Sequence, residues 1–107
     1  MDDILYFHMK NTDSLKPIFP DTIRGLFTQI TELEDYIVEQ DALHRLTLMI
    51  KPYNEEFAKL IARNLENFIL TNNISPIEIK CETLDIHDLN IKKRRIKRNF
   101  QLNEVLK

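Results

Sequence analysis

The fold of this chain is decided by the stretch RLTLMIKPYNEEFAKLIARNLENFIL, at residues 45–70. Its first part alternates apolar with more polar side chains, as in a strand with one face in water, and the apolar positions are Leu46, Leu48 and Ile50. Across residues 57–69 the apolar side chains recur at every third or fourth position instead, which predicts an amphipathic helix. Asn54 is placed to cap the start of this helix, and Asn72-Asn73 to end it with a left-handed residue. A strand with one wet face that leads into a helix indicates a sheet covered on one side.

Weaker patterns on either side of this stretch predict the remaining elements. A second helix is expected from Pro20, because proline is well tolerated in a first helical turn. Its apolar face would comprise Ile23, Leu26, Phe27, Ile30 and Leu33. Further strands are expected at 4–8, 36–40 and 77–82. The strand at 36–40 would pair with 46–50 across a turn at Asp41.

The order of these elements along the chain is strand, helix, strand, strand, helix, strand. This order predicts an α+β fold, namely a split βαβ (ferredoxin-like) two-layer sandwich with two helices on one face of an antiparallel sheet. With 107 residues, the chain has the length of a single domain spanning 1–107.

Composition excludes or disfavours several classes of site. Gly25 is the only glycine, so a glycine-rich phosphate loop is excluded. Cys81 is the only cysteine, so the chain cannot form an internal disulfide. The histidines lie on separate predicted segments, at His8, His44 and His87, and we expect no metal site. The sequence lacks the run of about 20 apolar residues that a membrane span needs, and its N-terminus lacks the features of a signal peptide, so we expect a cytoplasmic protein without a membrane partner.

The most informative functional feature is the basic run KKRRIKR at residues 92–98, which has six cations in seven positions. Residues 1–91 contain 16 acidic and 8 basic side chains, a net charge of −8, while residues 92–107 contain 7 basic and 1 acidic, a net charge of +6. A concentrated cationic segment on an acidic domain indicates an anionic partner. The basic run is compatible with a solvated tail, with a patch for nucleic acid, and with one lysine that meets a nucleotide phosphate or a carboxylate.

Three short stretches give the chain a family resemblance. They are Asp2-Asp3-Ile4-Leu5, Ile18-Phe19-Pro20 and Asn90-Ile91-Lys92-Lys93-Arg94-Arg95-Ile96. In order and spacing they resemble the C-terminal (lid) domain of AMP-forming acyl-CoA ligases, most closely the phenylacetate–CoA ligase branch. The first stretch is similar to the hinge sequence of that family, the second to the entry of its first lid helix, and the third to its terminal Gly-Lys-x-x-Arg motif. The resemblance covers nearly the whole chain and agrees with the fold that the patterns predict.

The resemblance implies roles for individual residues. Lys92 falls on the catalytic lysine of the family, which stabilises the charges of the acyl carboxylate and the nucleotide α-phosphate while the acyl-adenylate forms. Arg95 falls on the supporting basic residue three positions later, in the basic C-terminal segment 92–107. Asp2 falls on the hinge aspartate, within a hinge-like start at 1–3. Because Ile91 stands where the family has glycine, Lys93 is an alternative catalytic position and a further supporting cation.

The resemblance also implies partners and cofactors. In the family, a large N-terminal adenylating domain holds most of the contacts to ATP, coenzyme A, Mg and a small carboxylic acid substrate. That domain is absent from this sequence, so we expect the chain to supply the adenylation lysine and to be inactive by itself. The alternative interpretation is a stand-alone binding module that uses residues 92–98 to bind nucleic acid or an acidic partner protein.

Overall fold

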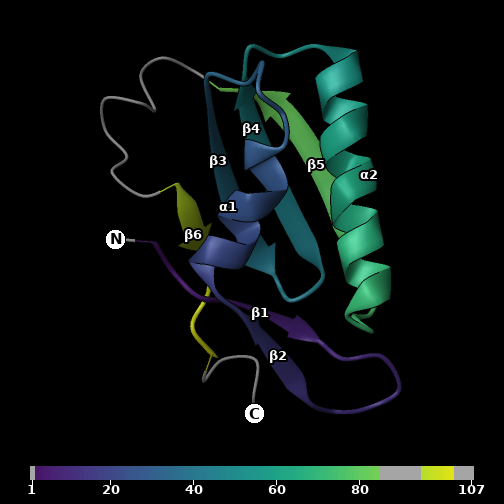
Figure 1. The fold of residues 1–107 in the computed structure, drawn as a ribbon. Helices are drawn as coiled ribbons and strands as arrows, with labels where there is room; N and C mark the ends of the chain where they lie inside the picture. Colours follow the sequence, from purple (N-terminus) through teal and green to yellow (C-terminus); the bar gives the residue numbers. More distant parts are fainter. Residues whose placement is uncertain (1, 85–94, 103–107) are drawn as a thin grey trace.

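The computed structural model describes residues 2–84 and 95–102 of the chain (Figure 1). Its elements are, in order, β1 (Leu5–His8), β2 (Leu15–Ile18), α1 (Pro20–Thr28), β3 (Asp35–Ala42), β4 (Arg45–Lys51), α2 (Glu55–Thr71), β5 (Glu78–Thr83) and β6 (Ile96–Arg98). Four strands form one sheet in the order β5-β4-β3-β6, and β1 and β2 form a separate hairpin. The hairpin lies beneath the larger sheet in the view of Figure 1.

Both helices pack on the same face of the four-stranded sheet (Figure 1). The helices contribute Ile23, Phe27, Ile61, Leu65 and Ile69 to the hydrophobic core. The sheet contributes the side chains of its helix-facing side, which are Val38, Leu46, Leu48, Ile50 and Ile96. Removal of this apolar surface from water is the main source of stability. The predicted α+β class, with two helices on one face of a sheet, is therefore confirmed.

The strand directions differ from the predicted antiparallel sheet. β3 and β4 form an antiparallel hairpin, but β5 runs parallel to β4, and β6 runs parallel to β3. The helix α2 carries the chain back to the end of the sheet at which β4 began, so that β5 runs in the direction of β4. In an antiparallel ferredoxin-like sheet the first strand would separate these two strands. Here β1 pairs with β2 instead, and β5 takes the place beside β4.

Local signals at the ends of elements agree with the structure in most places. Asn54 caps α2, because its side-chain oxygen accepts a hydrogen bond from the backbone N–H of Phe57 at 2.9 Å. Asn73 follows α2 with a φ of 60°, the expected left-handed residue. The hairpin turn lies at 43–44 rather than at Asp41, which forms an irregularity in the pairing of β3 with β4.

The sequence does not predict β2 and β6. β2 contains Pro17, a residue that weakens any strand signal. β6 has three residues and lies inside the basic run, where charge hides the alternation. β2 pairs with β1 across a turn, and β6 pairs with β3, which is distant in the sequence. The pattern of residues within each short strand therefore carries little information about it.

A buried glutamine joins the hairpin to the larger sheet. Gln40 on β3 is 0% exposed. Its Nε2 donates a hydrogen bond to the carbonyl of Tyr6 at 2.6 Å, and its Oε1 accepts one from the N–H of Tyr6 at 3.1 Å. One side-chain amide thus satisfies both backbone groups of a residue in β1, which fixes the position of the hairpin.

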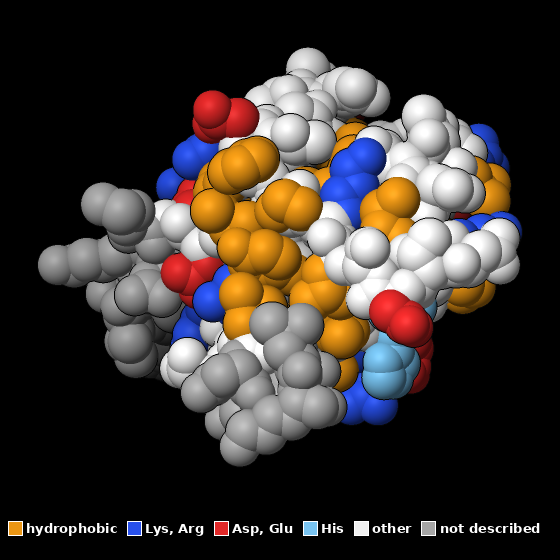
Figure 2. Space-filling model, turned by 90° about the horizontal axis from the view of Figure 1, so that it is seen from below, with side chains coloured by type: hydrophobic (Ala, Val, Ile, Leu, Met, Phe, Trp, Pro, Cys, Tyr) orange, Lys and Arg blue, Asp and Glu red, His pale blue; other side chains and the backbone are white. Residues whose placement is uncertain are grey.

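The hairpin also presents apolar side chains to the surface. Figure 2 shows hydrophobic side chains gathered on the side seen from below, where β1 and β2 lie in Figure 1. Phe19, which follows β2, is 56% exposed, Pro17 is exposed, and Leu15 is half-buried. We call these three residues the hairpin patch.

Candidate functional site

The start of the chain meets the basic run at the outer edge of β6. Asp2 Oδ1 accepts hydrogen bonds from the backbone N–H groups of Arg95 at 2.8 Å and Ile96 at 3.1 Å. The N–H of Asp3 donates to the carbonyl of Ile96 at 2.9 Å, and Asp3 Oδ2 accepts from the N–H of Arg98 at 2.9 Å. These contacts satisfy backbone groups of β6 that point away from β3. We call this arrangement of residues 2–3 on β6 the β6 cap.

Arg95 is held through both its backbone and its side chain. Its Nε donates to Asp35 Oδ1 at 2.8 Å, while Arg24 Nη2 lies 3.3 Å from Asp2 Oδ2. The side chains of Asp2 and Asp35 are 13% and 17% exposed, whereas that of Arg95 is 54% exposed. The hydrogen bond that Arg95 donates to Asp35 raises the pKa of Arg95, so the guanidinium keeps its charge. The site therefore presents a fixed, half-exposed cation directly after residues 92–94.

A cavity of about 250 Å³ lies beside Arg95. One wall is Tyr36, whose ring stacks on that of Phe27 with the centroids 4.2 Å apart. Burial raises the pKa of Tyr36, an effect that the charges of Arg95 and Arg24 partly oppose. The phenol is therefore neutral at physiological pH and can donate a hydrogen bond. Glu34 and Asp35 also line this cavity, and Asp35 already binds Arg95, so the cavity is poorly suited to an anion.

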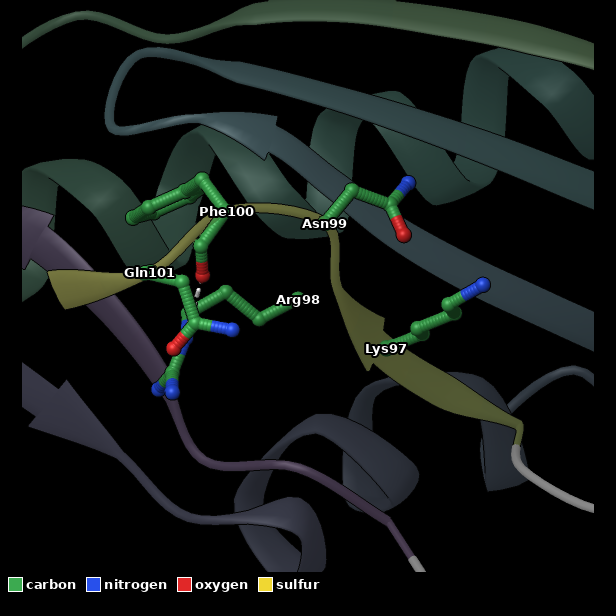
Figure 3. Close-up of a pocket in the computed structure, with 5 residues that line it drawn as sticks. All are labelled: Lys97, Arg98, Asn99, Phe100 and Gln101. Carbon is green, nitrogen blue, oxygen red and sulfur yellow. Dashed lines mark hydrogen bonds between the residues drawn. The ribbon is translucent and has the colours of Figure 1, made fainter. Parts of the chain in front are cut away.

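The guanidinium group of Arg98 binds other groups of the same chain. Its Nη1 donates to the carbonyl of Ile4 at 2.8 Å and its Nε to the carbonyl of Phe100 at 3.2 Å. Its guanidinium also lies 5.1 Å from the centre of the Tyr6 ring, a cation–π contact. An open cavity of about 350 Å³ is lined by residues 97–101 (Figure 3). Because Arg98 is held by these contacts, it is poorly placed to bind an anion in this cavity.

The remaining polar groups of the same strand lie among carboxylates. Lys97 is paired in register with Glu39 on the sheet face opposite the helices. Asn99 Nδ2 donates to Glu39 Oε2 at 3.2 Å and to Asp41 Oδ1 at 3.0 Å. This face of the strand thus adds negative charge beside the basic run, and it does not form a cluster of cations.

The sequence assigns roles to Asp2, Lys92, Lys93 and Arg95, and the structure describes the first and the last of these. It brings Asp2 and Arg95 into direct contact, whereas Lys92 and Lys93 lie outside the described residues. The catalytic, supporting and hinge roles of these residues stay predictions.

Other members of the site are not evident from the sequence. Arg95 contacts Asp35, a residue 60 positions away, and no local pattern indicates such a pair. Gln40 has a signal in retrospect, because it is a polar residue at the inward position of an otherwise apolar alternation with Tyr36 and Val38.

Comparisons with models of protein families, with curated proteins and with solved structures found no match to this chain. Over residues 2–84 and 95–102, His, Cys, Asp and Glu side chains form no group of three or more that could hold a metal ion. Neither helix in this part of the chain is long and apolar enough to cross a membrane.

Proposed function

We propose that this chain is the C-terminal lid domain of an adenylate-forming carboxylate–CoA ligase and that Lys92 supplies its adenylation lysine. Lys93 is the alternative position for this lysine. A large N-terminal adenylating domain would hold most of the contacts to ATP, Mg, coenzyme A and a small carboxylic acid. The protein would then act in the cytoplasm, where ATP and coenzyme A are found.

The observation that carries this proposal is the β6 cap. In a lid domain the catalytic lysine must be rigidly connected to the hinge, because rotation of the lid about the hinge carries the lysine to the reacting carboxylate. Asp2, at the hinge-like start, binds the backbone of Arg95 and Ile96, and Ile96 is 0% exposed in the core. A rotation at residues 1–3 would therefore be transmitted to the basic run through short hydrogen bonds.

The anchoring of Arg95 fits a positioning role. Asp2 binds its backbone and Asp35 binds its side chain, so both parts of the residue are fixed relative to the sheet. Arg95 follows Lys92 by three positions. Because Arg95 is fixed, the short connection to it would restrict the range of positions open to the ammonium group of Lys92. Such preorganisation lowers the cost of aligning a charge with the reacting group.

The hairpin patch supports docking against a larger domain. Pro17 and Phe19 are two positions apart and both are exposed. Figure 2 shows apolar side chains gathered on the side of the molecule where the hairpin lies. Apolar side chains grouped in this way mark surfaces that contact another protein or domain. An adenylating domain is a partner of this kind.

The proposal is tested by acid-dependent exchange of pyrophosphate into ATP, measured on the chain together with the adenylating domain, in one polypeptide or in two. We expect Lys92→Ala to lower the exchange rate by about 100-fold or more, because a single positioned charge contributes that much to the transition state. Lys97→Ala is the matched control, since it removes a lysine of the same basic run. We expect it to change the rate by less than about twofold. Lys93→Ala identifies which of the two adjacent lysines acts.

Two results would contradict the proposal. One is an equal loss of exchange in Lys92→Ala and Lys97→Ala, which would indicate a general effect of charge. The other is full exchange by the adenylating domain in the absence of this chain. A loss in Lys93→Ala alone would instead move the catalytic position by one residue.

The competing function, a nucleic-acid patch at residues 92–98, has less support. Phosphate binding requires cations that are free to approach the backbone, yet Arg95 binds Asp35 and Arg98 binds the carbonyl of Ile4. We therefore expect a labelled oligonucleotide to show little binding in fluorescence anisotropy at physiological salt. Tight binding with a steep dependence on salt would favour the patch over the ligase.

A further inference from the structure

The outer edge of β5 carries backbone hydrogen-bonding groups without a partner in the described part of the chain. β5 pairs with β4 on one side, where the N–H groups of Glu78 and Leu84 donate to the carbonyls of His44 and Ile50. Successive residues of a strand direct their backbone N–H and C=O groups to opposite sides. The backbone groups of the intervening odd-numbered residues therefore point outward, away from β4. These residues are Ile79, Cys81 and Thr83. An open edge of this kind can accept another strand.

The side chains of β5 divide between the two faces of the sheet. Ile79 and Cys81 pack against the helix-covered core. Lys80 and Glu82 lie on the opposite face, with Lys80 Nζ 2.9 Å from Glu82 Oε1 and side chains that are 69% and 43% exposed. Opposite charges two positions apart on one face can also pair across two antiparallel strands.

Charge selects one register for pairing β5 with a second copy of itself. In two registers the outward-pointing backbone groups of the two copies of β5 face one another, and these registers give the longest overlap of the strands. A register centred on Lys80 places Lys80 opposite Lys80 and Glu78 opposite Glu82, and like charges directly opposite are destabilising. A register centred on Cys81 places each Lys80 opposite the Glu82 of the other strand. It also makes pairs of Ile79 with Thr83, and of Cys81 with its own copy, whose outward backbone groups can exchange hydrogen bonds.

We propose that two copies of this chain associate through the outer edges of β5, antiparallel about a two-fold axis at Cys81. Each Lys80 then binds Glu82 of the partner copy, and the two four-stranded sheets become one continuous sheet. The same pairing is blocked at β6, because Asp2 and Asp3 already bind its outward backbone groups. This association is independent of the proposed ligase function.

The test is sedimentation equilibrium of the full chain over a range of concentrations. We expect a monomer–dimer equilibrium in which Lys80→Glu and Glu82→Lys each raise the dissociation constant by about tenfold or more, because each sets like charges opposite one another. The double variant K80E/E82K restores opposite charges and should return the constant to within about threefold of the original. Lys59→Glu, on the exposed side of α2, is the matched control and should leave it unchanged.

Mixing the two single variants gives the sharpest test. In an equimolar mixture of Lys80→Glu with Glu82→Lys, one strand carries acidic side chains at both positions and the other carries basic ones. A heterodimer in the register centred on Cys81 then pairs opposite charges at positions 80 and 82, so the mixture should associate more tightly than either variant alone. Both variants lack the Lys80–Glu82 pair within the strand, so restored folding cannot explain this recovery.

Hydrogen exchange of the backbone amides locates the contact. The N–H groups of Ile79, Cys81 and Thr83 should become protected as the concentration of the chain rises, and those of Glu78 and Lys80, which already face β4, should not change. The proposal is overturned if the chain stays monomeric at all concentrations. It is also overturned if the single variants associate as well as the original chain, or if their mixture associates no better than either one.

Discussion

The two edges of the four-stranded sheet differ in how their backbone groups are satisfied. At β6, Asp2 and Asp3 bind the outward N–H and carbonyl groups. At β5, no residue within 2–84 and 95–102 does so. An edge closed by its own chain is fixed to one internal partner, whereas an open edge can pair with another molecule. The comparison shows that an edge strand is open to another molecule when its outward backbone groups have no partner. The presence of such a partner matters more than the sequence of the strand itself.

The largest expected effect comes from emptying the core position of β6. Ile96 is 0% exposed, and Ile96→Ala should lower the free energy of unfolding by about 3 kcal/mol through lost burial and the cavity left behind. Ile79→Ala is the control on β5, where the side chain is half-buried, and should cost less than half as much. Unfolding in urea, followed by circular dichroism, measures both. Equal losses would mean that the two edge strands are held equally by the core.

A smaller effect is expected from opening the β6 cap. Asp2→Ala removes an acceptor of two backbone N–H groups and the partner of Arg24, and should destabilise the fold by about 1–3 kcal/mol. Asp21→Ala is the matched control, because Asp21 also pairs with Arg24 but is 97% exposed. We expect its effect in the same urea experiment to be too small to resolve. A similar cost for the two variants would show that the ion pair matters and the cap does not.

The smallest expected effect concerns the thiol at the open edge. Burial raises the pKa of Cys81 above its ordinary value of 9.0. A group whose pKa is higher in the folded state adds stability that is complete below its unfolded pKa and is lost as pH rises through the folded value. The free energy of unfolding should therefore fall above pH 9, and Cys81→Ala should show a shallower fall. Tyr36 and Lys80, whose pKa values are also raised, steepen the curve equally in both proteins. Identical curves would place the thiol of Cys81 in water at the β5 edge.

The sequence predicts the helices and the central hairpin because their patterns are long and periodic. Seventeen residues of α2 repeat one apolar face, and Asn54 marks its start. The sequence does not predict which strand lies beside β4, because β1 pairs with β2 and leaves that place to β5. Patterns within a strand carry no information about such competition between distant segments.

The candidate site is predictable only as separate parts. The basic run and Asp2 are visible in the sequence as a charged segment and a hinge-like start. Their contact is not visible, since Asp2 and Arg95 are 93 positions apart. Asp35 shows no signal at all, because an aspartate at the start of a strand is common and its guanidinium partner is chosen by the tertiary fold.

The separation between Asp2 and Arg95 also has a consequence for the newly made protein. All the residues between Asp3 and Ile96 must be synthesised before β6 can reach β3 and before Asp2 and Asp3 can bind it. During that interval β3 and β5 both offer unpaired strand borders, which favours wrong association between neighbouring nascent chains. Translation speed and chaperone supply should therefore influence the yield of native protein.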